Sequence, residues 1–274
     1  MNIKAALQGA PRGEKLPEVV GRVSLVGAGP GDPELLTMKA IRAITQCDVL
    51  VHDRLVSKPI LDIAGDSTLR ISVGKAAGRH SVPQHEINAL LVTLARAGKV
   101  VCRLKGGDPF IFGRGGEEIE TLAEAGIAWT VVPGITAAQG CAAAASVPLT
   151  HRGLARSVRY VTGHCRDDEP LVLDWAGLTD PDTTLVVYMG HQHAATVATE
   201  LLTRGRAAST PVLCISQGTT PSERRFSTRI DRLASDLAVA KLPSPVLYII
   251  GEVVDVAARL HDTFKARATA EAVG

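Results

Sequence analysis

Long apolar runs, an excess of charge of one sign and paired cysteine motifs are all missing from this sequence. Its 274 residues include no stretch of about 18 consecutive apolar residues, so no segment is predicted to span a membrane. Thirty basic residues nearly balance 28 acidic ones, and a net charge of +2 does not indicate the clearly basic face of a nucleic-acid-binding protein. The first residues, MNIKAALQGAPRGEKLPE, lack the apolar core of a secretory signal. We therefore expect a cytoplasmic protein with neither a membrane nor a nucleic acid as partner.

The cysteines are odd in number and form no CxxC pair, which is unlike a disulfide framework or a zinc site. Most lie among apolar or small residues and are predicted to be buried, reduced thiols: Cys47, Cys102, Cys141, Cys165 and Cys214. His191 and His193 stand close together, but no third ligand is evident beside them. We interpret both as surface residues at the start of a helix and expect no metal.

Apolar runs that end at glycine or proline alternate along the chain with segments of helical periodicity. The predicted strands are Arg22–Ala28, Asp48–Val51, Leu69–Val73, Lys99–Leu104, Ile127–Val132, Ser157–Thr162, Thr183–Met189, Pro211–Gln217, Arg224–Thr228 and Pro245–Ile250. The predicted helices are Pro33–Gln46, Pro83–Ala97, Glu117–Ala125, Thr136–Ala145, His191–Arg204, Asp231–Ala240 and Val254–Lys265. This alternation predicts an α/β fold in which helices cover both faces of the sheets.

The preferred domain boundary lies near Pro133–Gly134. It predicts an N-terminal α/β domain over 21–133 and a C-terminal α/β domain over 134–262, with tails over 1–20 and 263–274. No sequence repeat relates the two domains. Ligands of such folds bind at the carboxyl ends of strands, and several unusual loops follow predicted strands.

The first of these loops, GAGPGDP at 27–33, is similar to a dinucleotide-binding loop but departs from it at two positions. Asp32 stands where the last glycine is needed, and its carboxylate repels a pyrophosphate and competes for the same amide donors. Pro30 removes one more donor. Asp32 instead suits the N-cap of a helix that begins at Pro33. A nicotinamide-dependent oxidoreductase is therefore an alternative that this loop disfavours.

Three further loops have compositions that suit a binding site. KGGDPFIFGRGG at 105–116 combines glycines, which let a ligand approach the backbone, with apolar side chains that can form a wall for a planar ligand. VPGITAAQGC at 132–141 joins a strand to a helix N-terminus, and PLTHRGLARS at 148–157 places basic residues before a strand. Each is also compatible with an ordinary turn or a solvated loop.

The segments GAGPGDPELLT, VHDRLV, VGK, RLKGGDPFIFGRGGEE, VPGITAA, PLTHR, YMG and SQGT, taken in this order, resemble the tetrapyrrole methylase family. The resemblance covers roughly residues 21–255 and is closest to the members that methylate uroporphyrinogen III. It implies two α/β domains with a cleft between them, a class III methyltransferase and not the common Rossmann methyltransferase fold. It also implies a homodimer that uses S-adenosylmethionine and releases S-adenosylhomocysteine.

The implied reaction is C-methylation of the tetrapyrrole uroporphyrinogen III at carbons 2 and 7, which gives precorrin-2 through precorrin-1. The cofactor has no phosphate, so a loop that repels pyrophosphate is compatible with it. Carried over residue by residue, the resemblance implicates these positions in cofactor binding: Pro30, Gly106, Gly107, Asp108, Ile111, Thr136, Ala137, Met189 and Gly218. A carboxylate such as Asp108 suits ribose hydroxyls, an ammonium group and a sulfonium.

Charged residues are the candidates for catalysis and for substrate binding. The resemblance indicates Asp53 of VHDRLV and Lys75 of VGK as an acid–base pair. The substrate has many carboxylates, which arginine binds bidentately, and the candidate residues are Arg114, Arg152, Arg156 and Arg79. The macrocycle must also lose a proton, and Glu117, three residues after Arg114, is a candidate acceptor beside Asp53.

Two segments depart from the family's usual pattern. AAAASVP has Ala144 and Ser146 where members often have a form like AAYAGIP, and Gly153 follows PLTHR where an HRD-type continuation is usual. These changes leave fine specificity open. A later corrin-stage C-methyltransferase of the same family and a non-catalytic ligand sensor are the further alternatives.

Overall fold

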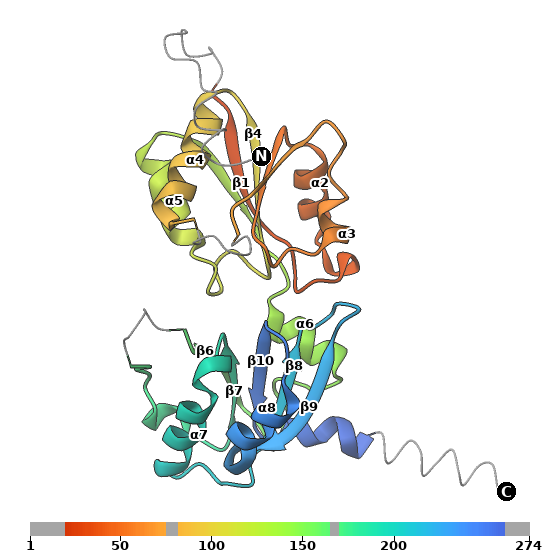
Figure 1. Ribbon diagram of the computed structural model, residues 1–274, viewed down its shortest axis with the longest axis vertical. Coiled ribbons are helices and arrows are strands. Elements are labelled where there is room, and N and C mark those ends of the chain that lie inside the picture. The colour runs from red at the N-terminus through yellow and green to blue at the C-terminus, as the bar shows by residue number, and fades with distance from the viewer. Residues whose placement is uncertain (1–19, 75–81, 165–169, 261–274) are drawn as a thin grey trace, which may run out of the picture. The chain divides into compact units, whose positions relative to one another are not determined.

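The computed structural model describes residues 20–74, 82–164 and 170–260. The protein divides into two compact units, unit 1 (Met1–Thr136) and unit 2 (Ala137–Gly274), and each contains one five-stranded sheet (Figure 1). The predicted fold class, two α/β units, is confirmed. The division falls shortly after the boundary expected at Pro133–Gly134, because the last strand of unit 1 ends there.

Unit 1 is built on a sheet with the strand order β3-β2-β4-β1-β5. Its strands are β1 (Arg22–Gly27), β2 (Val49–His52), β3 (Leu69–Ser72), β4 (Val100–Lys105) and β5 (Ala128–Val132). Every pairing in this sheet is parallel, so all five strands end at the same edge. The loops that follow the strands therefore lie side by side along that edge.

Helices cover both faces of the unit 1 sheet, as predicted. They are η1 (Pro33–Leu35), α2 (Met38–Thr45), α3 (Lys58–Leu61), α4 (Gln84–Arg96) and α5 (Gly115–Glu124). Successive side chains of a strand point to opposite faces, so Val49 and Val51 pack with α4 and α5 whereas Leu50 packs with α2 and α3. Figure 1 shows these two helix pairs on opposite sides of the strands.

The prediction of one continuous helix over Pro33–Gln46 is wrong, because the structure has two separate helices there. Leu36 and Thr37 are extended, with ψ of 141° and 150°, and they separate η1 from α2. The Asp32 carboxylate accepts a hydrogen bond from the Glu34 N–H at 2.9 Å and so caps only the short turn. The Thr37 hydroxyl accepts from the Ala40 N–H at 3.1 Å and is the N-cap of α2. A second capping residue thus starts a second helix.

Unit 2 contains a mixed sheet with the order β6-β7-β10-β8-β9. Its strands are β6 (Ser157–Thr162), β7 (Thr183–Tyr188), β8 (Pro211–Ser216), β9 (Arg224–Arg229) and β10 (Val246–Ile250). β6 and β7 are parallel, and the other three pairings are antiparallel. Its helices are α6 (Ala137–Ala144), η2 (Ala176–Leu178), η3 (His191–His193), α7 (Ala194–Thr203), η4 (Ile230–Arg232) and α8 (Leu233–Ala240).

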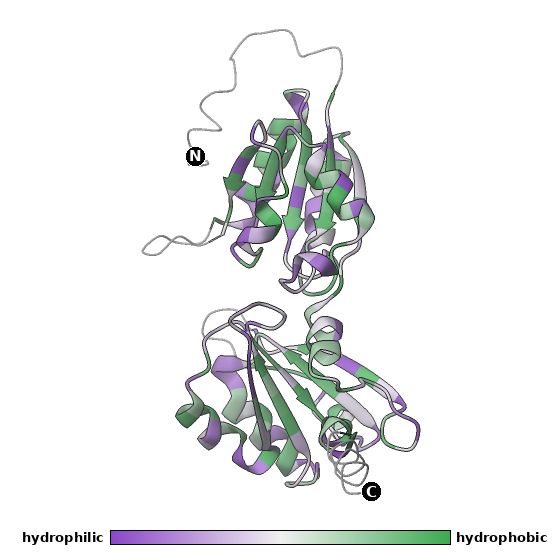
Figure 2. Ribbon diagram, turned by 90° about the vertical axis from the view of Figure 1, so that its right-hand side faces the viewer, coloured by the Kyte–Doolittle hydropathy of each residue, from purple (hydrophilic) through white to green (hydrophobic). Residues whose placement is uncertain are grey.

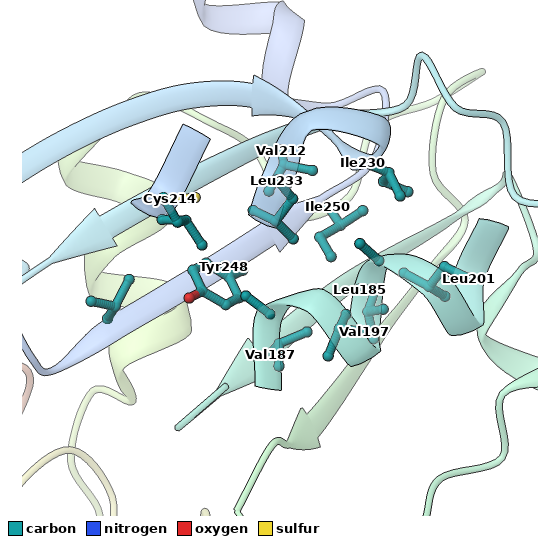
Figure 3. Packing of buried hydrophobic residues seen from close by; sticks show 14 of the residues in the cluster. Leu185, Val187, Val197, Leu201, Val212, Cys214, Ile230, Leu233, Tyr248 and Ile250 are labelled. Atoms are coloured by element: carbon teal, nitrogen blue, oxygen red, sulfur yellow. The ribbon is translucent and has the colours of Figure 1, made fainter. Parts of the chain in front are cut away.

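Each face of the unit 2 sheet is also covered by helices. Figure 3 shows the cluster on the face of α7 and α8, where Val197 and Leu201 of α7 pack with Leu185 of β7. The other face packs against α6 and the helix that begins at Val254, of which the described part ends at Leu260. Figure 2 shows that most strand residues of both units lie toward the hydrophobic end of the scale. Among the described residues, no helix is long and apolar enough to cross a membrane.

Gly27 and Gly134 of unit 1 pack so closely against neighbouring backbone that a side chain would not fit at either position. A Cβ atom at Gly134 would lie 2.2 Å from the Gly107 carbonyl oxygen and 2.8 Å from Gly27 Cα. We expect Gly134→Ala to lower the free energy of unfolding by roughly 1–3 kcal/mol, the usual cost of overpacking. Gly116→Ala is the matched control, because nothing lies within 4 Å of a Cβ there and alanine favours the helix by up to about 1 kcal/mol. Urea unfolding of both variants measures the difference, and equal stabilities would contradict the prediction.

Candidate active site

The first two glycine loops are joined at the carboxyl edge of the unit 1 sheet. The Gly29 N–H donates to the Gly107 carbonyl at 3.1 Å, and the Gly107 N–H donates to the Gly29 carbonyl at 2.7 Å. A Cβ atom on Gly27 would lie 2.5 Å from the Gly134 nitrogen, so the third loop touches the first. The structure thus brings three of the predicted loops together, and their glycines make that close approach possible.

Asp108 ties the second loop to the third. Its Oδ1 accepts from the Phe110 N–H at 2.8 Å, and its Oδ2 accepts from the Gly134 N–H at 3.0 Å. Thr136 at the end of the third loop is buried. Asp108 therefore has a structural task beside the cofactor contact predicted for it, and each carboxylate oxygen has lone-pair capacity left for a ligand.

Arg114 and Glu117 form a bidentate ion pair at the start of α5. The two bonds, Nε to Oε1 and Nη2 to Oε2, are each 2.7 Å long. The Arg114 hydrogen bond lowers the pKa of Glu117, and the Glu117 carboxylate raises the pKa of Arg114. Both side chains are about half exposed, so salt screens the pair. The spacing of three residues that the sequence showed therefore produces a direct contact.

Strained backbone is concentrated in the predicted site loops. Non-glycine residues with positive φ include Phe112 (52°) and Arg114 (58°) in the second loop, Met189 (54°) in YMG, and Gln217 (49°) and Thr219 (61°) in SQGT. An L-residue in this region costs about 1–2 kcal/mol relative to ordinary conformations. Such strain is typical of functional sites, where the surrounding structure maintains it.

A cluster of four charged side chains, three of them buried, joins β4 to α5 and to the end of β2, and most of it was not predicted from the sequence. We call Asp53, Arg103, Lys105 and Glu118 the buried charge cluster. Arg103 Nη2 donates to Asp53 Oδ1 at 2.6 Å, and Arg103 Nε donates to Glu118 Oε1 at 3.1 Å. Lys105 Nζ donates to the same Glu118 oxygen at 2.8 Å. Arg103, Lys105 and Glu118 are 1%, 3% and 0% exposed, so only Asp53 is open to a ligand.

Burial and ion pairing act in opposite directions on the two cations. Burial alone lowers the pKa of Arg103, but the Asp53 and Glu118 carboxylates outweigh it and raise that pKa. Burial lowers the pKa of Lys105, and the neighbouring Arg103 lowers it further. The signal for this cluster in the sequence is the pattern VVCRLK, in which two cations two residues apart interrupt an apolar strand and face the same side.

Of the predicted acid–base pair, only Asp53 lies among the described residues. Asp53 ends β2, and its carboxylate is 31% exposed and bound to Arg103. Lys75 and Arg79 lie outside the described residues.

In unit 2, Met189 and Gly218 lie at one edge of the sheet, after β7 and β8. The N-terminus of α6 is at the same edge, because the Ala138 N–H donates to the Tyr188 hydroxyl at 3.0 Å. A Cβ atom on Gly218 would lie 2.2 Å from Cys141 Sγ, so the loop after β8 packs closely against α6. Ala137, the first residue of α6, completes the group of predicted cofactor positions in unit 2.

The structure does not bring Arg152 and Arg156 to that edge. Arg156 precedes the amino end of β6, where its guanidinium pairs with Asp182. Arg152 lies in the turn closed by His151 and Ala155, and it lines a pocket of about 330 Å³ with Arg259. A strand of this length separates the two edges by roughly 20 Å. Within unit 2, these arginines are therefore remote from Met189.

The described cysteines are buried free thiols, as predicted, and Cys165 lies outside the described residues. His191 Nδ1 lies 3.2 Å from the Tyr248 hydroxyl at the 3₁₀ turn before α7. Within 20–74, 82–164 and 170–260, no group of three His, Cys, Asp or Glu side chains could hold a metal ion.

Comparison with known proteins identifies the family. A model of the tetrapyrrole (corrin/porphyrin) methylases matches residues 22–234. The chain therefore belongs to the tetrapyrrole methylase family, as the sequence motifs predicted.

Two relatives and one solved structure illustrate the similarity. A uroporphyrinogen-III C-methyltransferase of Paracoccus denitrificans is 54% identical over 93% of this chain and 88% of its own length. A siroheme synthase of Acinetobacter baylyi is 52% identical over 88% of this chain, which spans only about half (52%) of that relative. The crystal structure of the Thermus thermophilus uroporphyrin-III C-methyl transferase, complexed with S-adenyl homocysteine, has a TM-score of 0.75 and 43% identity, over 86% of this chain and 100% of that one.

The lowered pKa of Lys105 predicts a pH dependence of stability. Between the lowered pKa in the folded protein and the ordinary value near ~10.4, the unfolded chain binds more protons at this group. The contribution of Lys105 to the free energy of unfolding should therefore rise with pH in that window. We compare the free energies of unfolding of wild type and Lys105→Met. Their difference should shift in favour of wild type as pH rises from about 7 toward 10. Urea unfolding at several pH values measures it, exposed Lys99→Met is the control, and a difference that is constant with pH would contradict the prediction.

Proposed function

We propose that the chain catalyses the S-adenosylmethionine-dependent C-methylation of uroporphyrinogen III at carbons 2 and 7, giving precorrin-2 through precorrin-1. The observation that carries this proposal is the exposed Arg114–Glu117 pair beside paired glycine loops that lack phosphate-binding chemistry. The Paracoccus relative, which is 54% identical, supports it by its name, and the Thermus structure supports it by the cofactor product bound there.

The residues of unit 1 fit a cationic cofactor without phosphate. The amide at the start of η1 is occupied by the Asp32 carboxylate, and Lys105, which directly precedes Gly106, is buried against Glu118. A pyrophosphate would meet a negative charge there, whereas a sulfonium and an ammonium group would be attracted. S-adenosylmethionine supplies an activated methyl group when it is bound. We assign its binding to the nine positions that the family resemblance indicates, among them Pro30, Gly106 and Met189.

Arg114 is the residue that recognises the substrate's carboxylates. It reaches Glu117 with Nε and Nη2, so a substrate carboxylate either uses the remaining donors or replaces Glu117. Replacement would remove the hydrogen bond that lowers the pKa of Glu117 and would make that carboxylate a better proton acceptor. Substrate binding and proton acceptance are thereby coupled.

Two carboxylates remain as proton acceptors for the macrocycle. Asp53 is held by the buried Arg103, whereas Glu117 is held by the exposed Arg114. With an activated methyl group on the cofactor, the protein's contribution is mainly to position the reactants and to exclude water. The catalytic role of Lys75, the substrate contacts of Arg152, Arg156 and Arg79, the homodimer and the cytoplasmic location all stay predictions.

The runner-up is a later corrin-stage methyltransferase of the same family. The solved structures favour uroporphyrinogen III, because the uroporphyrin-III C-methyl transferase is 43% identical to this chain and a cobalt precorrin-4 methyltransferase is 26% identical. A nicotinamide-dependent oxidoreductase is not supported, since Pro33 at the start of η1 has no N–H and the Glu34 N–H is already bound by the Asp32 carboxylate.

Anaerobic incubation with S-adenosylmethionine and uroporphyrinogen III tests the proposed reaction. We expect consumption of two equivalents of cofactor per tetrapyrrole and, after oxidation, the chromophore of the dimethylated product. Reactions that lack either component are the controls. An unchanged tetrapyrrole would overturn the proposal, and methylation only of corrin-stage substrates would favour the runner-up.

Arg114→Ala separates substrate recognition from cofactor binding. The lost charged hydrogen bonds should lower kcat/KM for uroporphyrinogen III by about 100-fold, equivalent to ~2.7 kcal/mol. The dissociation constant for S-adenosylmethionine, measured by calorimetry, should stay within about twofold. Arg204→Ala is the matched control, because it removes an exposed Arg–Glu pair one helical turn apart in unit 2. Normal turnover by Arg114→Ala would sink the assignment of this residue.

A further inference from the structure

Glu118 has no task in the reaction proposed above, yet it is the only carboxylate among the described residues that is buried. Its Oε1 accepts three hydrogen bonds: from Arg103 Nε at 3.1 Å, Lys105 Nζ at 2.8 Å and Gln84 Nε2 at 3.1 Å. Its Oε2 is also buried and has no hydrogen-bond partner in the part of the chain that the structure describes. The three donors on Oε1 therefore fix this buried carboxylate in one place.

The group that Glu118 holds is the guanidinium of Arg103. A guanidinium is planar, so fixing Nε also fixes the directions in which the two terminal nitrogens donate. Nη2 of Arg103 then meets Asp53 Oδ1 at 2.6 Å, the shorter of its two carboxylate contacts. Asp53 is the member of the buried charge cluster that is partly exposed, at 31%. The chain of contacts therefore runs from a fully buried carboxylate to a carboxylate that a ligand can touch.

The elements that carry these groups are firmly placed. Arg103 and Lys105 belong to the central strand β4, and Asp53 follows β2, which is paired with β4. The Asp53 N–H donates to the Leu104 carbonyl at 3.2 Å, which fixes its backbone. What remains free to vary is the orientation of the Asp53 carboxylate, and Arg103 is the side chain that sets it.

We propose that Glu118 is a positioning residue that acts through Arg103 to hold the Asp53 carboxylate in the orientation required for proton transfer. This inference rests on the proposed function, in which Asp53 meets the macrocycle. The start of α5 would then contribute to the reaction in two ways. The exposed Arg114–Glu117 pair would contact the substrate, and the buried Glu118 would position Asp53 through Arg103. If Glu118 only neutralised Arg103 and Lys105, its replacement would lower stability, and the effect on kcat would not depend on Asp53.

A double-mutant cycle between Glu118→Gln and Asp53→Asn tests this link. Glutamine keeps the shape and one acceptor oxygen, so we expect kcat to fall on the order of 10-fold while the KM for S-adenosylmethionine stays within about twofold. In the Asp53→Asn background, Glu118→Gln should cause no further loss of kcat, because its route of action is already removed. Equal losses in both backgrounds would overturn the proposal. Glu120→Gln, which changes an exposed carboxylate of the same helix, is the control and should leave kcat unchanged.

A spectroscopic measurement keeps the inference separate from the proposed function. The Arg103 Nε–H resonance, observed by NMR in the full chain without substrate, should move in both Asp53→Asn and Glu118→Gln but not in Glu120→Gln. If wild type does not methylate uroporphyrinogen III, the proposed function fails while this signal still reports the coupling. A resonance that is unchanged in Asp53→Asn would refute the coupling itself. Should Glu118→Gln not fold, Arg103→Lys replaces it in the cycle, since lysine keeps the charge but lacks the planar fork that fixes the direction of the Asp53 contact.

Discussion

Two cations buried in a central β-strand must be met by carboxylates, and this requirement organises unit 1. Arg103 and Lys105 alternate with apolar residues of β4 and so face the side of the sheet that α4 and α5 cover. One carboxylate comes from the first turn of α5 and the other from the end of β2. The charged centre of the fold is therefore continuous with the loops in which the reaction is proposed to occur. The same side chains therefore stabilise the fold and take part in the proposed reaction.

Much of the fold could be predicted from the sequence, because apolar runs that stop at glycine or proline mark strands clearly. The strand Ser157–Thr162 was predicted with the bounds that the structure shows, and both sheets are covered by helices as expected. The helix Pro33–Gln46 was not predicted correctly, because two capping residues lie within one apparently periodic segment. The short α3 was missed because a single buried residue, Ile60, gives no periodic signal.

The loops of the site could be predicted from the sequence, but the ion pairs of the buried charge cluster could not. The glycine-rich motifs and the spacing of Arg114 and Glu117 are local features, and the structure joins them as expected. The buried charge cluster depends on contacts between residues 50 and 15 positions apart, which no local pattern shows. Arg156, predicted as a substrate-binding residue, stands at the amino end of β6. Because β6 and β7 are parallel, a residue that precedes β6 lies at the edge opposite to the residues that follow β7.

The alternation of charged and apolar residues in β4 has a consequence for how the sheet assembles. A slip of one residue in the pairing of β4 would move Arg103 and Lys105 to the face that is lined by Leu50 and Ile44. No carboxylate is buried on that face among the described residues, so both cations would be enclosed without counterions. An all-apolar strand would tolerate such a shift far better. The cations of β4 thus discriminate against misaligned sheets, and they make the correct register a condition for closing the core.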